Sequence, residues 1–147
     1  MIDVLIQSVF KNYKMKNPIK IKLFILGLGS NLKKLKKMVF DYGLNEYVFF
    51  SIIKDRKLLS KWYFNLDIYI HITKGETLST SILRAMSHGI PIVASNVGGM
   101  NELILKKGEC GYLTKNDPKN ILSSVKKIIK NKKNFNILSK NGLKKVL

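Results

Sequence analysis

The sequence has little cysteine, few acidic residues and no long hydrophobic run, and each shortage narrows the kinds of protein it encodes. A single cysteine, Cys110, in 147 residues excludes an internal disulfide and favours a reducing, cytoplasmic setting. The two histidines, His71 and His88, are not spaced with this cysteine as metal ligands usually are. We therefore expect a protein without a metal site.

No apolar run reaches the roughly 18 residues that a membrane-spanning helix needs. No stretch has the charged, apolar and small-residue order of a signal peptide. We expect a cytoplasmic protein, with peripheral contact at the inner face of the membrane as its only membrane association.

Acidic residues are scarce beside 27 lysines and arginines, which gives a formal net charge of +18. Such a field attracts nucleic acid, anionic lipid or a phosphorylated ligand. The charge is nearly all lysine and is spread along the chain, so we interpret it mainly as solvated helix faces. Arginine-rich clusters interleaved with aromatic residues, which are typical of nucleic-acid domains, are absent. A non-catalytic basic module for nucleic acid or anionic membrane remains the alternative.

The 147 residues fit a single domain over 1–147 with a sizeable core, since 46% are hydrophobic. Short apolar runs alternate with segments of helical periodicity. Strands are predicted at 21–26, 47–50, 67–72, 92–95 and 111–114, and helices at 2–15, 31–42, 56–64, 79–88, around 102–104, at 118–129 and at 132–147. This alternation predicts an α/β fold, a Rossmann-like parallel sheet with helices on both faces.

Helical spacing also predicts which side chains face the core. In the second helix these are Leu32, Leu35, Val39 and Phe40, and in the third Leu58, Leu59 and Trp62. Gly43 and Gly89 follow the last periodic residues of two helices, so both are expected to end them. Asp117 followed by Pro118 is typical of a helix start.

The stretch 73–95 is the centre of this pattern. A helix beginning near Ser79 or Thr80 would bury Leu78, Ile82, Leu83 and Met86 between two strands. Ligands of open parallel sheets bind at the carboxyl ends of the strands, where helix N-termini favour phosphate. Gly27 and Gly29 follow another strand, where glycine permits a sharp turn or close approach to a ligand.

Several short motifs occur in a characteristic order over almost the whole chain. They are Leu26-Gly27-Leu28-Gly29, Tyr42-Gly43-Leu44 with Val48-Phe49-Phe50, Asp67-Ile68-Tyr69, Gly75-Glu76, the run from Ala85 to Ser95, Val97-Gly98-Gly99-Met100-Asn101-Glu102, and Gly111-Tyr112-Leu113 with Asp117. The set resembles the C-terminal, donor-binding half of retaining glycosyltransferases with the GT-B fold. That group includes sucrose synthases and bacterial mannosyl- and galactosyltransferases.

The resemblance implies a role for Glu76 as the catalytic-site carboxylate that contacts the donor sugar near the reacting centre. It implies that the peptide N–H groups of Thr77, Leu78 and Ser79 approach the diphosphate or the sugar, where helix N-terminal amides stabilise negative charge. The remaining donor-binding positions it implies are Gly27, Gly29, Ile53, Lys54, Thr80 and Arg84. A solvated loop carboxylate is the alternative for Glu76. No metal or other cofactor is implied, only a nucleotide-diphosphate sugar as substrate.

Arg84 departs from the family pattern, because a second glutamate that holds the ribose usually stands there. Charged hydrogen bonds contribute roughly 1.5–3 kcal/mol each, so this exchange would weaken nucleotide binding by about tenfold to over a hundredfold. The alternative is that Arg84 reaches a phosphate.

Family members also carry an N-terminal acceptor domain, a first strand and a closing C-terminal helix that this sequence does not contain. We therefore expect the nucleotide-sugar-binding half of a hexosyltransferase of polysaccharide biosynthesis, inactive alone, with a glycan or lipid-linked acceptor. Its acceptor-binding part would be a separate chain or domain. A degenerate gene remnant without function is a further alternative.

Overall fold

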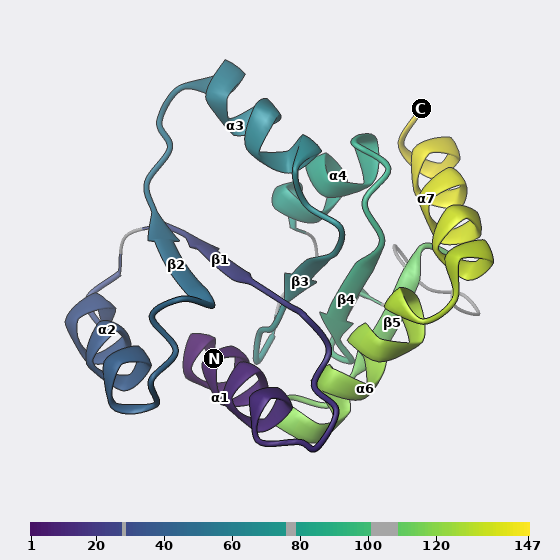
Figure 1. Cartoon of the computed structure of the whole chain (residues 1–147). Coiled ribbons are helices and arrows are strands. Elements are labelled where there is room, and N and C mark those ends of the chain that lie inside the picture. The colour runs from purple at the N-terminus through teal and green to yellow at the C-terminus, as the bar shows by residue number, and fades with distance from the viewer. Residues whose placement is uncertain (28, 76–78, 101–108) are drawn as a thin grey trace.

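The computed structural model describes residues 1–27, 29–75, 79–100 and 109–147. Helices and strands alternate along the chain, as Figure 1 shows. The elements are α1 (Ile2–Tyr13), β1 (Leu23–Leu26), α2 (Leu32–Asp41), β2 (Val48–Ser51), α3 (Arg56–Phe64), β3 (Tyr69–His71), α4 (Thr80–Ser87), β4 (Ile92–Ser95), β5 (Gly111–Thr114), α6 (Pro118–Ile129) and α7 (Lys132–Val146). All five predicted strands are present. The helix predicted around 102–104 lies outside the described residues.

The strands form two parallel sheets, with the orders β1-β2 and β3-β4-β5. In the first, Leu23 is opposite Val48. In the second, Ile92 of the central strand is opposite both Tyr69 and Gly111. Within each sheet the carboxyl ends of the strands therefore lie along one edge, which positions the loops that follow them together.

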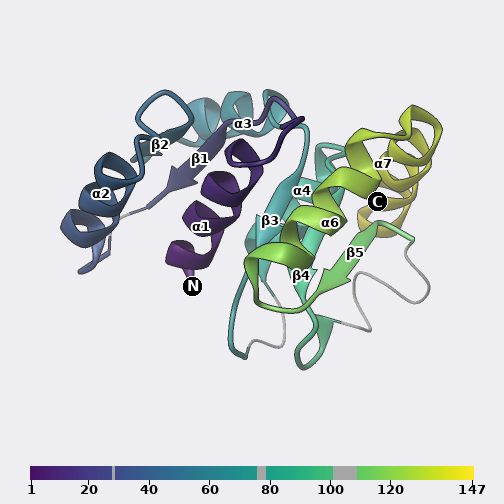
Figure 2. The ribbon, with the colours of Figure 1, turned by 60° about the horizontal axis from the view of Figure 1, so that its bottom comes forward.

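Strand β4 shows why helices cover both faces of its sheet. Ile92 and Ala94 pack in one hydrophobic cluster with residues of α3 and α4, whereas Val93 packs in another with residues of α6 and α7. Successive side chains of a strand point to opposite faces, so the two clusters lie on opposite sides of β4. Figure 2 shows α1 and α6 side by side across one face and α4 behind the strands. The predicted fold class is confirmed.

Local sequence signals determine several helix ends as predicted. The Asp117 side chain accepts a hydrogen bond from the Asn120 N–H at 2.9 Å, and Pro118 is the first residue of α6. This bond is the main reason that the pKa of Asp117 is lowered. Gly43 and Gly89 follow α2 and α4 with φ angles of 65° and 68°. In this left-handed region glycine closes the last helical turn without steric cost.

The first helix is shorter than predicted, and the first strand begins later. Helix α1 ends at Tyr13 rather than at residue 15, and β1 begins at Leu23 rather than at residue 21. The Asn12 side chain donates to the Ile19 carbonyl at 2.8 Å and accepts from its N–H at 3.2 Å. The Tyr13 hydroxyl donates to the Ile21 carbonyl at 2.8 Å and accepts from its N–H at 3.1 Å. Side chains of α1 thus replace strand pairing over this segment.

Two residues expected in the core are exposed. Phe40 is 72% exposed and Leu58 is 56% exposed. In each helix the buried stripe runs through neighbouring positions, namely 35, 38, 39 and 42 in and beside α2, and 59, 62, 63 and 66 in and beside α3. Phe40 and Leu58 each stand one residue away from a stripe position, which turns the side chain by about 100°.

Gly111 makes the closest backbone approach in the sheet and gives a test of the fold. A Cβ atom there would lie 1.8 Å from the Ile92 carbonyl oxygen. We expect Gly111→Ala to lower the free energy of unfolding by about 3 kcal/mol or more, because the β4–β5 ladder has to move. Urea denaturation measures this. Gly29→Ala is the matched control, since a Cβ there meets no atom within 4 Å. Equal stability of the two variants would contradict this packing.

Candidate functional site

Three loops at the carboxyl ends of β3, β4 and β5 are tied together by one buried serine. The Ser95 hydroxyl accepts a hydrogen bond from the Thr73 N–H at 2.8 Å and donates to the Asn116 Oδ1 at 2.5 Å. The Asn116 side-chain amide closes the ring by donating to the Thr73 carbonyl at 2.8 Å. Ser95 is fully buried. Buried hydrogen bonds of this kind are costly to break, so the ring fixes the path of the chain after β3.

The sequence prediction did not identify this ring. Thr73 and Ser95 bound the central stretch, Ser95 also ends the motif that begins at Ala85, and Asn116 belongs to no motif. Ser95 is the polar last residue of the otherwise apolar strand β4, and Asn116 directly precedes the N-cap residue of α6. These are weak signals, because only the parallel pairing of β4 with both neighbours brings the three residues together.

The segment that leads from this ring into α4 contains Glu76 and four of the nine predicted donor-binding residues. Gly75 donates its N–H to the Thr73 hydroxyl at 3.4 Å. Glu76, Thr77 and Leu78 lie outside the described residues. Ser79 is the buried N-cap residue of α4, and its hydroxyl lies 2.6 Å from that of Ser81. Thr80, the first helical residue, is exposed.

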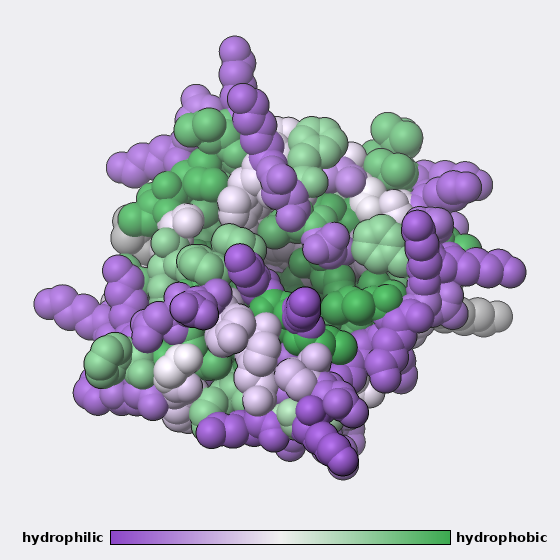
Figure 3. Space-filling view, viewed as in Figure 1, coloured by the Kyte–Doolittle hydropathy of each residue, from purple (hydrophilic) through white to green (hydrophobic). Residues whose placement is uncertain are grey.

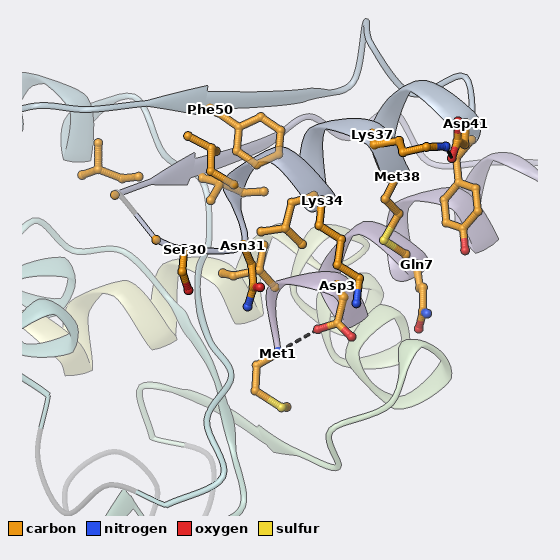
Figure 4. A pocket seen from close by; sticks show the side chains of 18 residues that line it. Met1, Asp3, Gln7, Ser30, Asn31, Lys34, Lys37, Met38, Asp41 and Phe50 are labelled. Atoms are coloured by element: carbon orange, nitrogen blue, oxygen red, sulfur yellow. Dashed lines mark hydrogen bonds and ion pairs between the residues drawn. The ribbon is translucent and has the colours of Figure 1, made fainter.

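Gly27 and Gly29 line a separate hollow of about 930 Å³ beside the N-terminus. Gly27 has a φ of 135° and donates its N–H to the Ser51 carbonyl at 3.0 Å, so the chain turns sharply as β1 ends. Figure 4 shows Ser30, Asn31 and Lys34 projecting into the hollow towards Met1 and Asp3.

An ion pair at the N-terminus borders this hollow. The Met1 ammonium lies 2.7 Å from the Asp3 carboxylate. The hydrogen bond from this ammonium to the Asp3 carboxylate is the main reason that the pKa of Asp3 is lowered. The rim of the hollow therefore carries a carboxylate that is already partnered by a cation.

Ile53 and Lys54 lie between β2 and α3 and do not line the hollow around Gly27 and Gly29. Ile53 is half-buried and Lys54 is exposed. The Asp55 side chain next to them accepts a hydrogen bond from the Leu58 N–H at 2.8 Å and caps α3. Their predicted role in donor binding stays a prediction.

Arg84 is exposed on α4, on the side that packs against α3. The pKa of Tyr63 is raised to about 12, mainly by burial and also by the nearby Tyr69, and the Arg84 guanidinium opposes this rise. The Tyr63 ring also stacks on His88, with ring centroids 5.3 Å apart. The charge of Arg84 thus lies close to the α3–α4 contact.

His88 fastens the end of α4 to α3. Its Nδ1 lies 2.8 Å from the Arg84 carbonyl oxygen, and its Nε2 lies 2.9 Å from the Ser60 hydroxyl. A carbonyl only accepts, so Nδ1 carries the proton and Nε2 accepts from Ser60. The hydrogen bond between His88 and Ser60 thus links the C-terminal end of α4 to α3.

The predicted site residues that the structure describes therefore fall into four groups. Gly27 and Gly29 share one hollow, Ser79 and Thr80 follow the loop held by Ser95, Arg84 lies further along α4, and Ile53 and Lys54 follow β2. No group of three or more histidine, cysteine or acidic side chains able to hold a metal occurs in the described part of the chain. Within the same ranges, every helix falls short of the length and apolar character that crossing a membrane demands.

Comparison with known proteins places the chain in a family. Residues 2–145 match the family described as Glycosyl transferases group 1. An uncharacterized glycosyltransferase of Methanocaldococcus jannaschii is 37% identical over 125 residues, which are 84% of this chain and 31% of that protein. Protein CapJ of Staphylococcus aureus is 35% identical over 121 residues, which are 82% of this chain and 28% of CapJ. The chain belongs to the glycosyl transferases group 1 family.

Solved structures agree on the fold. HepE of Anabaena, crystallised in complex with UDP-glucose, matches 96% of this chain and 38% of its own with a TM-score of 0.83 and 21% sequence identity. The likeness shows a Rossmann-like half of a GT-B fold. The chain spans under a third of the length of the two curated relatives above.

The serine ring gives a test of how the loops are held. We expect Ser95→Ala to lower the free energy of unfolding by about 1–3 kcal/mol, because the Thr73 N–H and the Asn116 side-chain oxygen Oδ1 both lose their hydrogen-bond partner. Hydrogen exchange at the Thr73 amide should accelerate as well. Ser123→Ala, at an exposed serine of α6, is the control and should stay within about 0.5 kcal/mol of the parent. An unchanged Thr73 exchange rate in Ser95→Ala would contradict the role of the ring.

Proposed function

We propose that the chain binds a nucleotide-diphosphate sugar at the carboxyl ends of its strands, as the donor-binding half of a retaining glycosyltransferase. The observation that carries the proposal is the Ser95 ring, which holds the loop after β3 where it leads into Glu76 and the start of α4. Family membership over residues 2–145 supports the same edge of the sheet. The UDP-glucose complex of HepE supports the class of ligand.

The chemistry at this edge suits a departing nucleotide diphosphate. The leaving group gathers negative charge, and amide N–H groups at a helix start stabilise it without rearranging. The start of α4 offers such amides around Ser79 and Thr80, and the N-cap side chain of Ser79 is bonded to Ser81 rather than to them. Glu76 then contacts the sugar near the reacting centre in this proposal.

The basic charge gives no specific support to nucleic acid as the ligand. Figure 3 shows hydrophilic side chains spread around the periphery of the face rather than gathered in one patch. The described ion pairs involve few of the lysines, for example Lys37 with Asp41 at 2.7 Å. We propose that the charge instead raises the encounter rate with a diphosphate, an effect that added salt screens.

We also propose that the acceptor site comes from another polypeptide or domain. The segments that match this chain make up less than a third of each of the two curated relatives, whereas the predicted donor positions lie within the chain. The 147 residues alone should bind the donor without transferring the sugar.

Arg84 gives the sharpest test, because its effect on binding has an unexpected sign. We expect Arg84→Glu to tighten UDP-glucose binding by about tenfold to a hundredfold in calorimetry, since a carboxylate accepts charged hydrogen bonds from ribose hydroxyls. From charge alone, replacing an arginine by a glutamate would weaken the binding of a dianionic ligand such as UDP-glucose. Arg56→Glu on α3 makes the same charge change elsewhere and should not tighten binding.

Two further comparisons belong to the same experiment. Glu76→Gln should weaken UDP-glucose more than UDP, because only the former carries the sugar. Absence of binding by UDP- and GDP-sugars at millimolar concentration, in the parent and in Arg84→Glu, would overturn the proposal. Steeply salt-dependent binding to duplex DNA in its place would favour the basic-module alternative.

A further inference from the structure

Lysine is concentrated in two segments of the chain, residues 11–22 and 126–133, which together we call the basic edge. Ten of the 25 lysines lie in these segments, although they make up only 20 of the 147 residues. Neither segment contains an acidic residue, and none occurs anywhere in 4–40 or in 118–147. The two segments therefore carry charge of one sign only.

The fold brings the two segments together into one surface. The Lys126 ammonium of α6 lies 3.2 Å from the sulfur of Met15, just beyond α1. Ile19 packs in the same hydrophobic cluster as Val125 of α6, and the two hydrogen bonds from the Asn12 side chain hold Ile19 in place. Figure 2 shows α1 and α6 side by side.

The basic edge lies away from the candidate donor site. Helix α1 leads into the amino end of β1, and α6 begins after the carboxyl end of β5, so both helices end towards the amino ends of these strands. The donor loops follow the carboxyl ends. A partner bound to the basic edge would therefore leave those loops open to solution.

Helix dipoles account for only part of this charge. Lysine near the carboxyl end of a helix interacts favourably with the dipole, which explains Lys126 and Lys127 in the last turn of α6. Lys132 and Lys133, by contrast, are the first two residues of α7, where the dipole is positive. Lys16 belongs to no helix. These lysines repel one another without help from the backbone.

Carboxylates do not compensate the charge either. Within the part of the chain that the structure describes, lysine pairs with a carboxylate in two places, Lys37 with Asp41 and Lys145 with Glu109, and neither place is in the basic edge. Nine of the ten lysines of the basic edge are exposed. A partner with many negative charges would supply the missing counter-charge.

Apolar side chains among the lysines indicate which polyanion fits. Met15 is 43% exposed, and Ile137, one turn beyond Lys133 on α7, is 48% exposed. Nucleic-acid surfaces typically combine charge with arginine and stacking aromatic rings, but the basic edge contains no arginine. Lysines around exposed aliphatic side chains suit an anionic bilayer, whose headgroups attract the charge and whose acyl boundary accepts the apolar groups.

We propose that the basic edge is a docking surface for a bilayer that contains anionic lipid. Its lysines contact the headgroups, and Met15 and Ile137 enter the boundary with the acyl chains. The candidate donor loops then face the aqueous side. The proposal does not rest on the nucleotide-sugar function and has a separate test.

Sedimentation with lipid vesicles tests this with the full 147-residue chain. Vesicles of phosphatidylcholine with about one third phosphatidylglycerol should bind the chain, and vesicles of phosphatidylcholine alone should not. Lys16→Gln combined with Lys133→Gln should weaken binding at least about tenfold, because each lysine at the surface contributes about fivefold. Lys33→Gln combined with Lys57→Gln removes the same charge from exposed positions outside the basic edge and should change binding by less than about threefold.

A second pair of variants separates a bilayer from other polyanions. Ile137→Gln should weaken vesicle binding by about threefold to tenfold without changing any affinity for duplex DNA, whereas Leu58→Gln, at an exposed leucine of α3, should change neither. The proposal is overturned if neutral vesicles bind equally well, if the two lysine pairs behave alike, or if Ile137→Gln and Leu58→Gln behave alike. Tighter binding to duplex DNA than to anionic vesicles also overturns it.

Discussion

The burial of Ser95 at the carboxyl end of β4 is the constraint on which the site depends. Strand β4 is paired on both edges and packed on both faces, so its last residue has no freedom to turn outward. The hydroxyl placed there has two polar partners, the Thr73 N–H and the Asn116 side chain. Because a buried polar group must be satisfied, core packing determines the course of a surface loop.

The parallel geometry of the strands accounts for the position of the candidate site. Paired strands bring their loops to one edge, and the ring at Ser95 shows this for β3, β4 and β5.

Most of the fold was predictable because its signals are local. Periodicity located all five strands, and Gly43, Gly89 and Asp117 were correctly predicted at helix ends. Errors arose where tertiary contacts decided the outcome. The side chains of Asn12 and Tyr13 delay the start of β1, and Phe40 and Leu58 fall one position away from their buried stripes. Helical spacing in the sequence does not show whether the buried stripe of a helix passes through a given residue or through the residue beside it.

The site was predictable in part only. The resemblance to glycosyltransferases is confirmed by the family match, whereas the edge of the sheet and the site residues that it implies stay predictions. The Ser95 ring was not predictable, since Thr73, Ser95 and Asn116 are 21 to 43 residues apart in sequence. The effect of arginine at position 84 depends on where the ribose lies, which the sequence does not specify.

The most direct test of the donor site is a map of amide chemical shifts during a titration with UDP-glucose. The account predicts changes at the carboxyl ends of the strands, at Gly27, Gly29, 73–75, Ser79 and Thr80. The amides of 45–47 and 66–68, which precede strands at the opposite edge, should stay unchanged. Changes confined to that opposite edge, or spread over the lysine-rich helices, would contradict the account.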